Sequence, residues 1–472
     1  MCRRLDESRL SRRGVKKRAP IALVLTLSVF VGAAVRPTAS GAVAQSARPN
    51  ILIILTDDQS TGELSAMPKT TAWLRKGGTL FDRGFVTTPL CCPSRSTIFS
   101  GRYIHNHGNT QNDHPFNLDQ SATFQRYLQD AGYTTALDGK FLTGWPNTTN
   151  PPHFGRFTIT SGGYYGAYFR SNTGGYKNPA TYSTTYLTQK ALEDIDVFER
   201  NDAKPWLLYV TPHAPHRDFT PEAKYANANV GTWDGNPAVF EADRRDKPPY
   251  VRASHITFAE GASVRRQQLR TLISVDDMVD AIFRKLQARG EAQNTLAIFS
   301  SDNGFLHGEH GLQRKAVPYT GSIGVPFLIR WPGHVPAGRV DSRFIANVDI
   351  APSLLAAAGI KPALKYPFDG KAMLSPSGLT DAAHAPLFLE YHFSPDFNDV
   401  PPWRSIRTKA YQYIQTYDKS GNVTFREYYD LVKDPWQNQN LLADGNSAND
   451  PDVAALSAKI AMYAKCVGAL CP

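Results

Sequence analysis

Short apolar runs alternate with amphipathic segments along most of this chain. The run at residues 50–55, Asn-Ile-Leu-Ile-Ile-Leu, is unbroken and rich in β-branched residues. Such a run is typical of a strand that is buried on both faces. Similar runs recur at residues 206–210, 295–300 and 326–331. The pattern therefore predicts a set of strands in the interior of a sheet.

Helical periodicity predicts helices between these strands, at residues 123–131, 267–288 and 351–358. Each segment is followed by a glycine that suits the end of a helix, namely Gly132, Gly290 and Gly359. Apolar strands that alternate with amphipathic helices predict an α/β fold, in which a mostly parallel central sheet is flanked by helices.

The chain outside this alternating pattern divides into long irregular segments and a distinct end. Residues 146–200 and 217–265 are rich in Gly, Tyr, Thr, Asn and Pro, so we expect long loops over the site that choose the substrate. From about Pro386 the pattern changes to short strands, such as one at residues 405–414, and a helix near 453–464. We therefore predict a catalytic domain at residues 45–385 and a smaller C-terminal α+β subdomain at residues 386–472.

The first 44 residues have the order of a cleaved signal peptide. A basic stretch precedes an apolar run at residues 21–35 and small residues that end at Ala44. The run is too short to span a bilayer comfortably, so no stable membrane anchor is expected. Ser11-Arg12-Arg13 partly fits a twin-arginine signal, which leaves the export route open between Sec and twin-arginine. The predicted location is secreted or cell-envelope.

This leader also explains the formal charge of +10. Residues 1–44 hold nine Lys and Arg against two acidic residues, a net +7, which leaves +3 for the rest of the chain. A basic charge that is confined to a leader does not indicate a nucleic-acid partner.

Polar clusters follow three of the predicted strands: Asp57 and Asp58, then His213 and His216, then Asp302 and Asn303. Active sites of such sheets lie beyond the carboxyl ends of the strands, so we expect the three clusters to meet at one edge. The oxygen ligands among them suit Ca²⁺ or Mg²⁺ rather than zinc. Taken singly, each acidic pair is also explained by a helix cap or a tight turn.

The cysteines divide into two pairs once Cys2 is assigned to the leader. Cys466 and Cys471 lie close together at the C-terminus and are expected to form a disulfide in an oxidising compartment. Cys91 and Cys92 are adjacent and cannot easily bond to each other. Pro93 favours the first turn of a helix, so Cys91 is predicted at a helix N-terminus, which attracts anions. The alternatives are a plain thiolate nucleophile and a buried, inert pair.

The segment Cys91-Cys92-Pro93-Ser94-Arg95 resembles the Cys-x-Pro-Ser-Arg signature of the formylglycine-dependent sulfatases, a family of the alkaline phosphatase superfamily. Four other segments agree with that family in order, and together they span residues 48 to 441: residues 48–59, 132–140, 301–315 and 428–441. The double cysteine, the Ile-His-Asn-His at residues 104–107 and Leu142 look most like N-acetylglucosamine-6-sulfatases and other heparan-type sulfatases. Many arylsulfatases have His where this chain has Leu142, and family members often have Glu where it has Thr320. These departures weaken the subfamily assignment and leave the reaction class unchanged.

The resemblance implies a hydrolase of sulfate monoesters, with a nucleophile that a formylglycine-generating enzyme makes by oxidising Cys91. It implies metal ligation by Asp57, Asp58, Cys91, Asp302 and Asn303, with Ca²⁺ as the expected ion. The implied catalytic residues are Cys91, Arg95, Lys140, His216 and Lys315. His216 is preferred over His213 as the acid that protonates the leaving oxygen, and His213 and His310 are expected to contact substrate.

The expected substrate is a sulfated carbohydrate or an aryl sulfate. The first alternative is an arylsulfatase, or a phosphate or phosphonate monoester hydrolase of the same superfamily, because sulfate and phosphate esters share size and tetrahedral geometry. A second is a secreted binder of sulfated polysaccharide that has lost turnover. The presence of Cys91, Arg95 and Lys140 argues against this second alternative.

Overall fold

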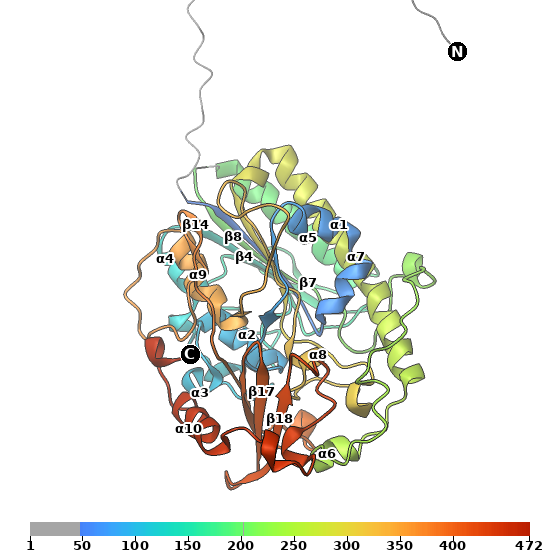
Figure 1. Ribbon diagram of the computed structural model, residues 1–472. Coiled ribbons are helices and arrows are strands. Elements are labelled where there is room, and N and C mark those ends of the chain that lie inside the picture. The colour runs from blue at the N-terminus through green and yellow to red at the C-terminus, as the bar shows by residue number, and fades with distance from the viewer. Residues whose placement is uncertain (1–47, 202) are drawn as a thin grey trace, which may run out of the picture. The chain divides into compact units, whose positions relative to one another are not determined.

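A computed structural model describes residues 48–201 and 203–472, so the predicted signal peptide lies outside the described residues. A ten-stranded sheet forms the centre of the described chain (Figure 1). In spatial order its strands are β11 (Arg339–Asp341), β2 (Thr79–Phe81), β10 (Leu328–Arg330), β9 (Thr295–Ser301), β1 (Asn50–Thr56), β8 (Trp206–Thr211), β4 (Thr134–Gly139), β5 (Arg156–Thr160), β6 (Phe169–Ser171) and β7 (Gly175–Lys177).

The middle of this sheet is parallel, as predicted. Strands β9, β1, β8, β4 and β5 run in the same direction, and β1 pairs with β9 over its whole length. Towards the edges of the sheet, β10 is antiparallel to β9 and β6 is antiparallel to β5, which a mostly parallel sheet allows. The α/β fold with a mostly parallel central sheet is confirmed.

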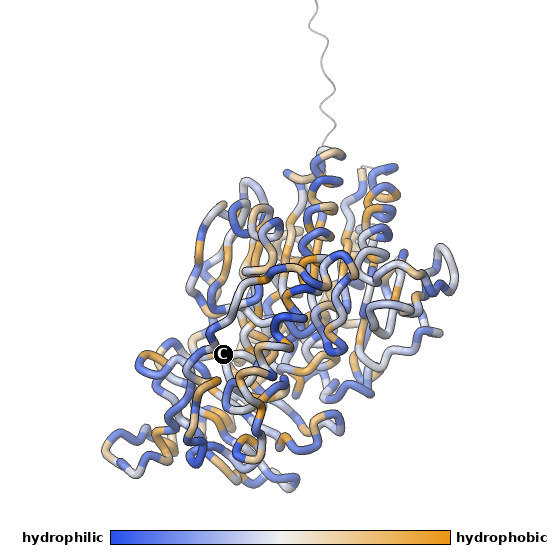
Figure 2. Tube along the Cα trace, turned by 90° about the vertical axis from the view of Figure 1, so that its right-hand side faces the viewer, coloured by the Kyte–Doolittle hydropathy of each residue, from blue (hydrophilic) through white to orange (hydrophobic). Residues whose placement is uncertain are grey.

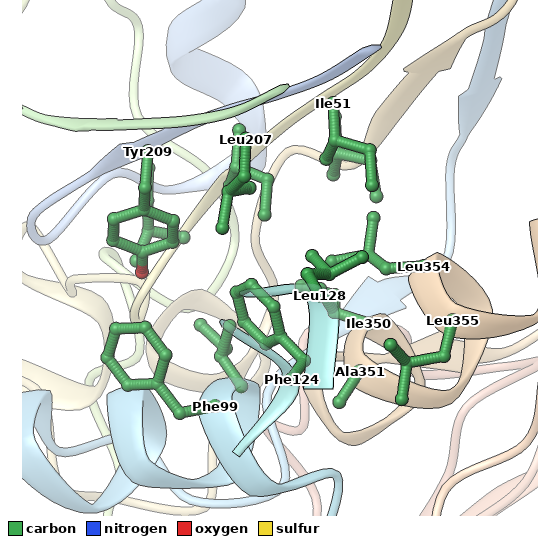
Figure 3. Packing of buried hydrophobic residues seen from close by; sticks show 14 of the residues in the cluster. Ile51, Phe99, Phe124, Leu128, Leu207, Tyr209, Ile350, Ala351, Leu354 and Leu355 are labelled. Atoms are coloured by element: carbon green, nitrogen blue, oxygen red, sulfur yellow. The ribbon is translucent and has the colours of Figure 1, made fainter. Parts of the chain in front are cut away.

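Alternate residues of the central strands pack against two layers of helices. Ile51 and Leu207 contribute to the core beneath α2 (Cys91–Ser100), α4 (Phe124–Asp130) and α9 (Ile350–Ala357), and Figure 3 shows these side chains directed toward that layer. Leu52 and Leu208 point the other way, into the core beneath α5 (Ser183–Phe198) and α7 (Phe258–Arg289). This two-sided burial explains the unbroken apolar runs, and Figure 2 shows hydrophobic segments concentrated in the interior.

The prediction of two long loops is wrong in part. Residues 146–200 contain β5, β6, β7 and the 16-residue helix α5, whose residues Leu187, Ala191 and Ile195 are buried at helical spacing. The second segment is mainly irregular, but it includes α6 (Pro249–Arg252) and the first two turns of α7, which begins nine residues earlier than predicted. A capping box formed by Thr257 and Glu260 sets that earlier start.

The C-terminal part contains a second, antiparallel sheet. Its strands are β15 (Leu387–Tyr391), β16 (Trp403–Arg407), β17 (Tyr411–Tyr417) and β18 (Val423–Asp430), in that order. The single strand predicted at residues 405–414 is therefore wrong, because a turn separates β16 from β17. The predicted closing helix is present as α10 (Val453–Tyr463), and Cys466 and Cys471 form the predicted disulfide.

Shorter elements complete the described chain: α1 (Pro68–Thr70), α3 (Ile104–His107), α8 (Thr320–Ile323), β3 (Gly84–Phe85), β12 (Ile345–Ala346), β13 (Leu374–Ser375) and β14 (Gly378–Leu379). Within the described ranges, the structure has no helix long and apolar enough to cross a bilayer.

Candidate active site

Asp57 and Asp58 lie directly after β1 and are almost completely buried. Asp58 has φ = +72°, a left-handed conformation that is uncommon for a residue other than glycine. Its amide group donates to Oδ1 of Asp302 at 3.2 Å, which ties the end of β1 to the end of β9. The neighbouring carboxylates are therefore held against each other by the backbone.

Asp302 and Asn303 reach this position because β9 lies next to β1, with Thr56 opposite Ser301 in the register. Asn303 donates from Nδ2 to Oδ1 of Asp58 at 2.6 Å. Its own Oδ1 is buried and has no hydrogen-bond partner among the described residues. The structure thus brings two pairs of oxygen-bearing side chains together, Asp57 with Asp58 and Asp302 with Asn303, although the pairs are about 245 positions apart in the sequence. Oδ1 of Asn303 is left without a hydrogen bond from any residue that the structure describes.

Cys91 is the first residue of α2, as Pro93 predicts. All ten residues of this helix are buried, including its polar residues, so it shows no amphipathic pattern. Leu90 provides no side-chain cap, and Oδ1 of Asn112 instead accepts from the backbone amide of Cys92 at 3.0 Å. Asn112 was not predicted, because nothing in its local sequence indicates this approach.

Arg95 is fully buried one turn further along α2. Its Nε donates to Oδ2 of Asp302 at 2.8 Å, and its Nη1 donates to the hydroxyl of Thr211 at 2.7 Å. Its Nη2 lies 3.7 Å from Asp57. Burial alone would lower the pKa of Arg95, but the charges of Asp302 and Asp57 outweigh burial and raise it. The guanidinium group therefore joins α2 to the ends of β1, β8 and β9.

Lys140 follows β4, where the strand runs very close to β8. Gly139 has φ = +120°, and a Cβ atom at that position would lie only 2.0 Å from the carbonyl oxygen of Thr211. Only glycine fits there. The backbone then turns so that the Nζ atom of Lys140 donates to Oδ2 of Asp57 at 2.5 Å.

Lys315 contacts both Cys91 and Asp58. Its Nζ atom lies 2.7 Å from the sulfur of Cys91 and 2.5 Å from Oδ1 of Asp58. Burial alone would lower the pKa of Lys315, but Asp58 and Cys91 raise it well above its usual value. Lys315 is therefore a buried, charged group in direct contact with the first residue of α2.

The pKa values within the cluster differ among chemically similar groups. Although burial alone would raise the pKa of Asp57, Lys140, His216 and Arg95 hold it well below its usual range. Burial and the charge of Asp57 raise the pKa of Asp302 to about 6. Burial also raises the pKa of the Cys91 thiol to about 12, in spite of the two nearby lysines. A plain thiolate nucleophile at neutral pH is therefore disfavoured.

Two histidines follow β8 and lie beside the cluster. Nε2 of His216 is 3.8 Å from Asp58, and the side chain retains 19% exposure. The rings of His213 and His216 are 4.8 Å apart. Burial, followed by the positive charge of His216, lowers the pKa of His213 to about 3. Burial also lowers the pKa of His216, although Asp57 and Asp58 oppose this effect.

His310, which was expected to contact substrate, lines a pocket of about 340 Å³ together with Glu63, His307 and Tyr319, and its side chain is held by residues outside the cluster around Cys91. Its Nδ1 atom forms a hydrogen bond with Oε2 of Glu241, and its ring packs 4.4 Å from that of Tyr319. The side chain is buried, with 1% exposure for the residue. These contacts hold the segment before Lys315 in place, and none of them joins His310 to the cluster around Cys91.

The donor set fits a divalent cation. Ligand atoms of Asp57, Asp58, Cys91 and His216 all lie within 4.8 Å of one another. Asp302 and Asn303 add hard oxygens at the same place, and the free Oδ1 of Asn303 is an unused ligand. Buried carboxylates and an amide oxygen suit Ca²⁺ or Mg²⁺. Asp302 also accepts a hydrogen bond from Arg95, so the same carboxylate would hold both Arg95 and the cation.

Comparisons with known proteins show to which family this sequence is similar. The sulfatase family model matches residues 49–360, and the model of the N-sulphoglucosamine sulphohydrolase C-terminal region matches residues 308–462. The human N-acetylglucosamine-6-sulfatase is 28% identical over 513 residues, which cover 96% of this chain and 90% of that protein.

Extracellular sulfatase homologues are more similar but much longer. The Sulf-1 homologues of Caenorhabditis elegans and Drosophila melanogaster are each 34% identical, over 66% and 70% of this chain. The chain spans only 47% and 31% of their lengths.

A solved structure in complex with its substrate D-glucosamine-2-N,6-O-disulfate shares the fold, with a TM-score of 0.78 and 24% identity over 88% of this chain and 97% of that one. The family model covers well over half of the sequence and includes every residue of the cluster. The chain therefore belongs to the sulfatase family.

Proposed function

We propose that this protein is an exported sulfatase that hydrolyses sulfate monoesters on glycosaminoglycan-type sugars, with 6-O-sulfated N-acetylglucosamine as the substrate unit. The observation that carries this proposal is the convergence of Arg95, Lys140 and Lys315 on the start of α2, beside three buried carboxylates. Three cations and three carboxylates balance in charge. A divalent cation would therefore give the site the net positive charge that an anionic ester requires.

The chain's own residues account for binding and orientation of a sulfate group. Lys140 and Lys315 are the two lysines whose charges act on Cys91, and both would hold sulfate oxygens. The N-terminus of α2 adds the positive end of a helix dipole at the same point. Arg95, fixed by Asp302 and Thr211, would orient the side chain at position 91.

The nucleophile and the metal complete this proposal. Asp57, Asp58, Asp302 and Asn303, together with the modified side chain at position 91, would hold Ca²⁺. When present, formylglycine supplies a hydrated aldehyde as nucleophile, and the divalent ion neutralises charge on the sulfate oxygens. Burial raises the pKa of the Cys91 thiol, which argues against a plain thiolate as the nucleophile.

A histidine is needed to protonate the leaving sugar oxygen. His216 suits this role better than His213, because its ring is more exposed and lies beside Asp58. The Nδ1 atoms of both histidines lack a hydrogen-bond partner within the described part of the chain, so this feature does not distinguish them. His213, packed against Gly162 and the ring of Tyr164, would position His216 and line the entrance to the site.

The relatives support the substrate class and the location. The human and goat relatives are named N-acetylglucosamine-6-sulfatases, and the invertebrate relatives are named as extracellular sulfatases. Together with the basic and apolar leader of this sequence, these names support export and an extracellular sugar substrate.

The test is to produce the protein with a formylglycine-generating enzyme and to assay three esters: 6-O-sulfated N-acetylglucosamine, an aryl sulfate and a phosphate monoester. We expect hydrolysis of the sugar sulfate with the highest kcat/KM, and no turnover by Cys91→Ala. Mass spectrometry of the peptide that contains residue 91 should find an aldehyde in place of the thiol. A strong preference for the phosphate ester, or an active protein with an unmodified thiol, would contradict the proposal.

A further inference from the structure

A divided groove lies at the end of the C-terminal sheet, away from the nucleophile. It consists of two depressions of about 430 Å³ each. They share part of their lining, namely Phe393, Pro402, Tyr417, Asp418 and Lys419. The walls are the end of β15, the start of β16, the β17–β18 turn and α6, and Figure 1 shows β17, β18 and α6 at the same end of the molecule. We call this feature the C-terminal groove.

Aromatic rings and unpaired cations line the C-terminal groove. The Nζ atom of Lys419 lies 5.3 Å from the centre of the Phe393 ring, and the guanidinium carbon of Arg404 lies 5.2 Å from the centre of the Tyr417 ring. Arg252 is a third cation, on the α6 wall. Within residues 48–201 and 203–472, the structure gives none of these three cations an ion-pair partner.

The acidic residues of the groove are occupied by other contacts. Asp418 accepts hydrogen bonds from the backbone amides of Ser420 and Asn422 in its own turn. Asp399 is paired with Arg314 through both of its carboxylate oxygens. Arg314 therefore neutralises Asp399, whereas Asp418 keeps its negative charge. The lining holds the three cations Arg252, Arg404 and Lys419 against this one carboxylate, which leaves net positive charge for an anionic ligand.

One short segment connects this groove to the candidate active site. Residues 393–402 form a wall of the groove, and within them Asp396 accepts from Nδ2 of Asn112 at 2.7 Å. Asn112 in turn accepts from the backbone amide of Cys92. Asp399 holds Arg314, the residue before Lys315. The segment that lines the groove is thus tied by hydrogen bonds to Asn112 and Arg314, beside the first residues of α2 and Lys315.

We propose that the C-terminal groove binds the portion of a sulfated polysaccharide that extends beyond the sugar whose sulfate is removed. Sulfate groups would pair with Arg404 and Lys419, and the apolar face of a sugar ring would pack on the partly exposed ring of Phe393. Charge complementarity points to this occupant, because the groove combines cations that have no ion-pair partner in the described chain with the partly exposed ring of Phe393. This inference rests on the proposed function, and it makes the enzyme selective for chains over single sugars.

The test compares two substrates with the double variant Arg404→Gln, Lys419→Gln. One substrate is a glycosaminoglycan hexasaccharide that ends in 6-O-sulfated N-acetylglucosamine, and the other is the same sulfated sugar as a monosaccharide. For the hexasaccharide we expect KM to rise by about tenfold, the loss expected from one or two charge-assisted contacts. We expect kcat on both substrates, and KM for the monosaccharide, to stay within a factor of two or so of wild type.

The matched control is Lys409→Gln, Lys459→Gln. It removes the same charge from two exposed residues of the same subdomain, one in the turn at the opposite end of β16 and β17 and the other on α10. This variant should leave KM unchanged for both substrates. An equal rise in KM for the hexasaccharide in both double variants would overturn the proposal, because the effect would then come from the net charge of the protein and not from the groove.

Binding measured without turnover separates this inference from the proposed function. Calorimetric titration of Cys91→Ala with the hexasaccharide should give weaker binding when Arg404→Gln and Lys419→Gln are added, and no detectable binding of the desulfated hexasaccharide. Wild-type protein that binds the hexasaccharide but hydrolyses neither substrate would overturn the proposed function alone. Equal binding of sulfated and desulfated hexasaccharide, or binding that is unaffected by the substitutions, would overturn the assignment of the groove.

Discussion

The ammonium group of Lys315 lies 2.7 Å from the sulfur of Cys91 and is almost completely buried. In such a water-poor position a cation stabilises developing negative charge far better than in solvent. Lys315→Met keeps the apolar stem of the side chain and removes the charge. We expect kcat/KM for a sulfate ester to fall by roughly 10²–10³, the usual effect of removing one preorganised donor at a reacting group.

Steady-state kinetics on the sugar sulfate would measure this change, with a thermal melt to confirm that the variant is folded. Lys224→Met is the control, because the side chain of Lys224 is 52% exposed and lies among other surface charges. It should keep the wild-type kcat/KM. A Lys315→Met enzyme with unchanged kcat/KM would exclude Lys315 from the reaction.

Asp302 combines two tasks, since it accepts from Arg95 and lies among the expected metal ligands. Asp302→Ala would leave the buried charge of Arg95 without its partner, at a cost of roughly 3–5 kcal/mol. Asp302→Asn is the better variant, because it retains an oxygen for Arg95 and weakens the site for a cation. We expect Ca²⁺ to raise the Tm of chelator-treated wild-type protein and to have much less effect on Asp302→Asn.

Differential scanning fluorimetry over a Ca²⁺ series would measure these shifts. Asp196→Asn serves as a control, because this aspartate is 35% exposed and pairs with Lys285 and Arg289. It should respond to Ca²⁺ like wild type. The metal assignment fails if the Tm of wild-type protein is indifferent to both the chelator and Ca²⁺.

The central strands were predictable because both faces of each are covered by helices. That burial produces the uninterrupted apolar runs of β1, β8 and β9. Strand β4 was not identified, since Thr134 and Thr135 begin it and Asp138 and Gly139 end it, which leaves only a weak apolar pattern. Helix α5 was missed for a different reason. Its periodic core residues lie within a segment whose composition resembles a loop.

The candidate site was predictable only as far as its residues follow strands or match a family motif. Asp57 and Asp302 meet because β1 and β9 are neighbours, a relationship that the rule for parallel sheets anticipates. The contacts of Arg95 with Thr211 and of Asn112 with Cys92 depend on how separate segments pack. The position of His310 depends on its pairing with Glu241, which lies in an irregular segment.

His216 and His213 can be distinguished by the leaving group. A histidine that donates a proton matters most when the leaving oxygen is a poor leaving group, as in a sugar, and least for an acidic phenol. We expect His216→Ala to lower kcat/KM by roughly 10²–10⁴ on the sugar sulfate and much less on an aryl sulfate with an acidic phenol. His213→Ala should affect both esters to a similar extent.

The ratio of kcat/KM for the two esters is the quantity to compare. It should change strongly in His216→Ala and stay close to the wild-type ratio in His213→Ala, which is the matched control for a lost imidazole. If the ratio changes only in His213→Ala, the roles of the two histidines are reversed.

Glu63 and His307 form a buried pair outside the cluster, with Nε2 of His307 3.3 Å from Oε1 of Glu63. Burial raises the pKa of Glu63 to about 8 and lowers the pKa of His307 to about 3. Both side chains are therefore neutral near pH 7, despite a separation that would suit an ion pair. Oε2 of Glu63 also accepts from the backbone amide of Ser60 at 3.0 Å.

This neutral glutamic acid makes the protein less stable as pH rises. In the unfolded chain Glu63 ionises near its ordinary pKa of 4.5, whereas in the folded chain it holds its proton up to about pH 8. Between these values unfolding releases a proton, so the free energy of unfolding falls with increasing pH by an amount on the order of a few kcal/mol.

Glu63→Gln cannot ionise and retains an oxygen for Ser60. We therefore expect it to raise Tm relative to wild type at pH 8 and to have little effect at pH 4.5. The control Glu193→Gln, at a side chain 56% exposed, should show no such pH-dependent difference, and an equal shift at both pH values in Glu63→Gln would refute the neutral state of Glu63.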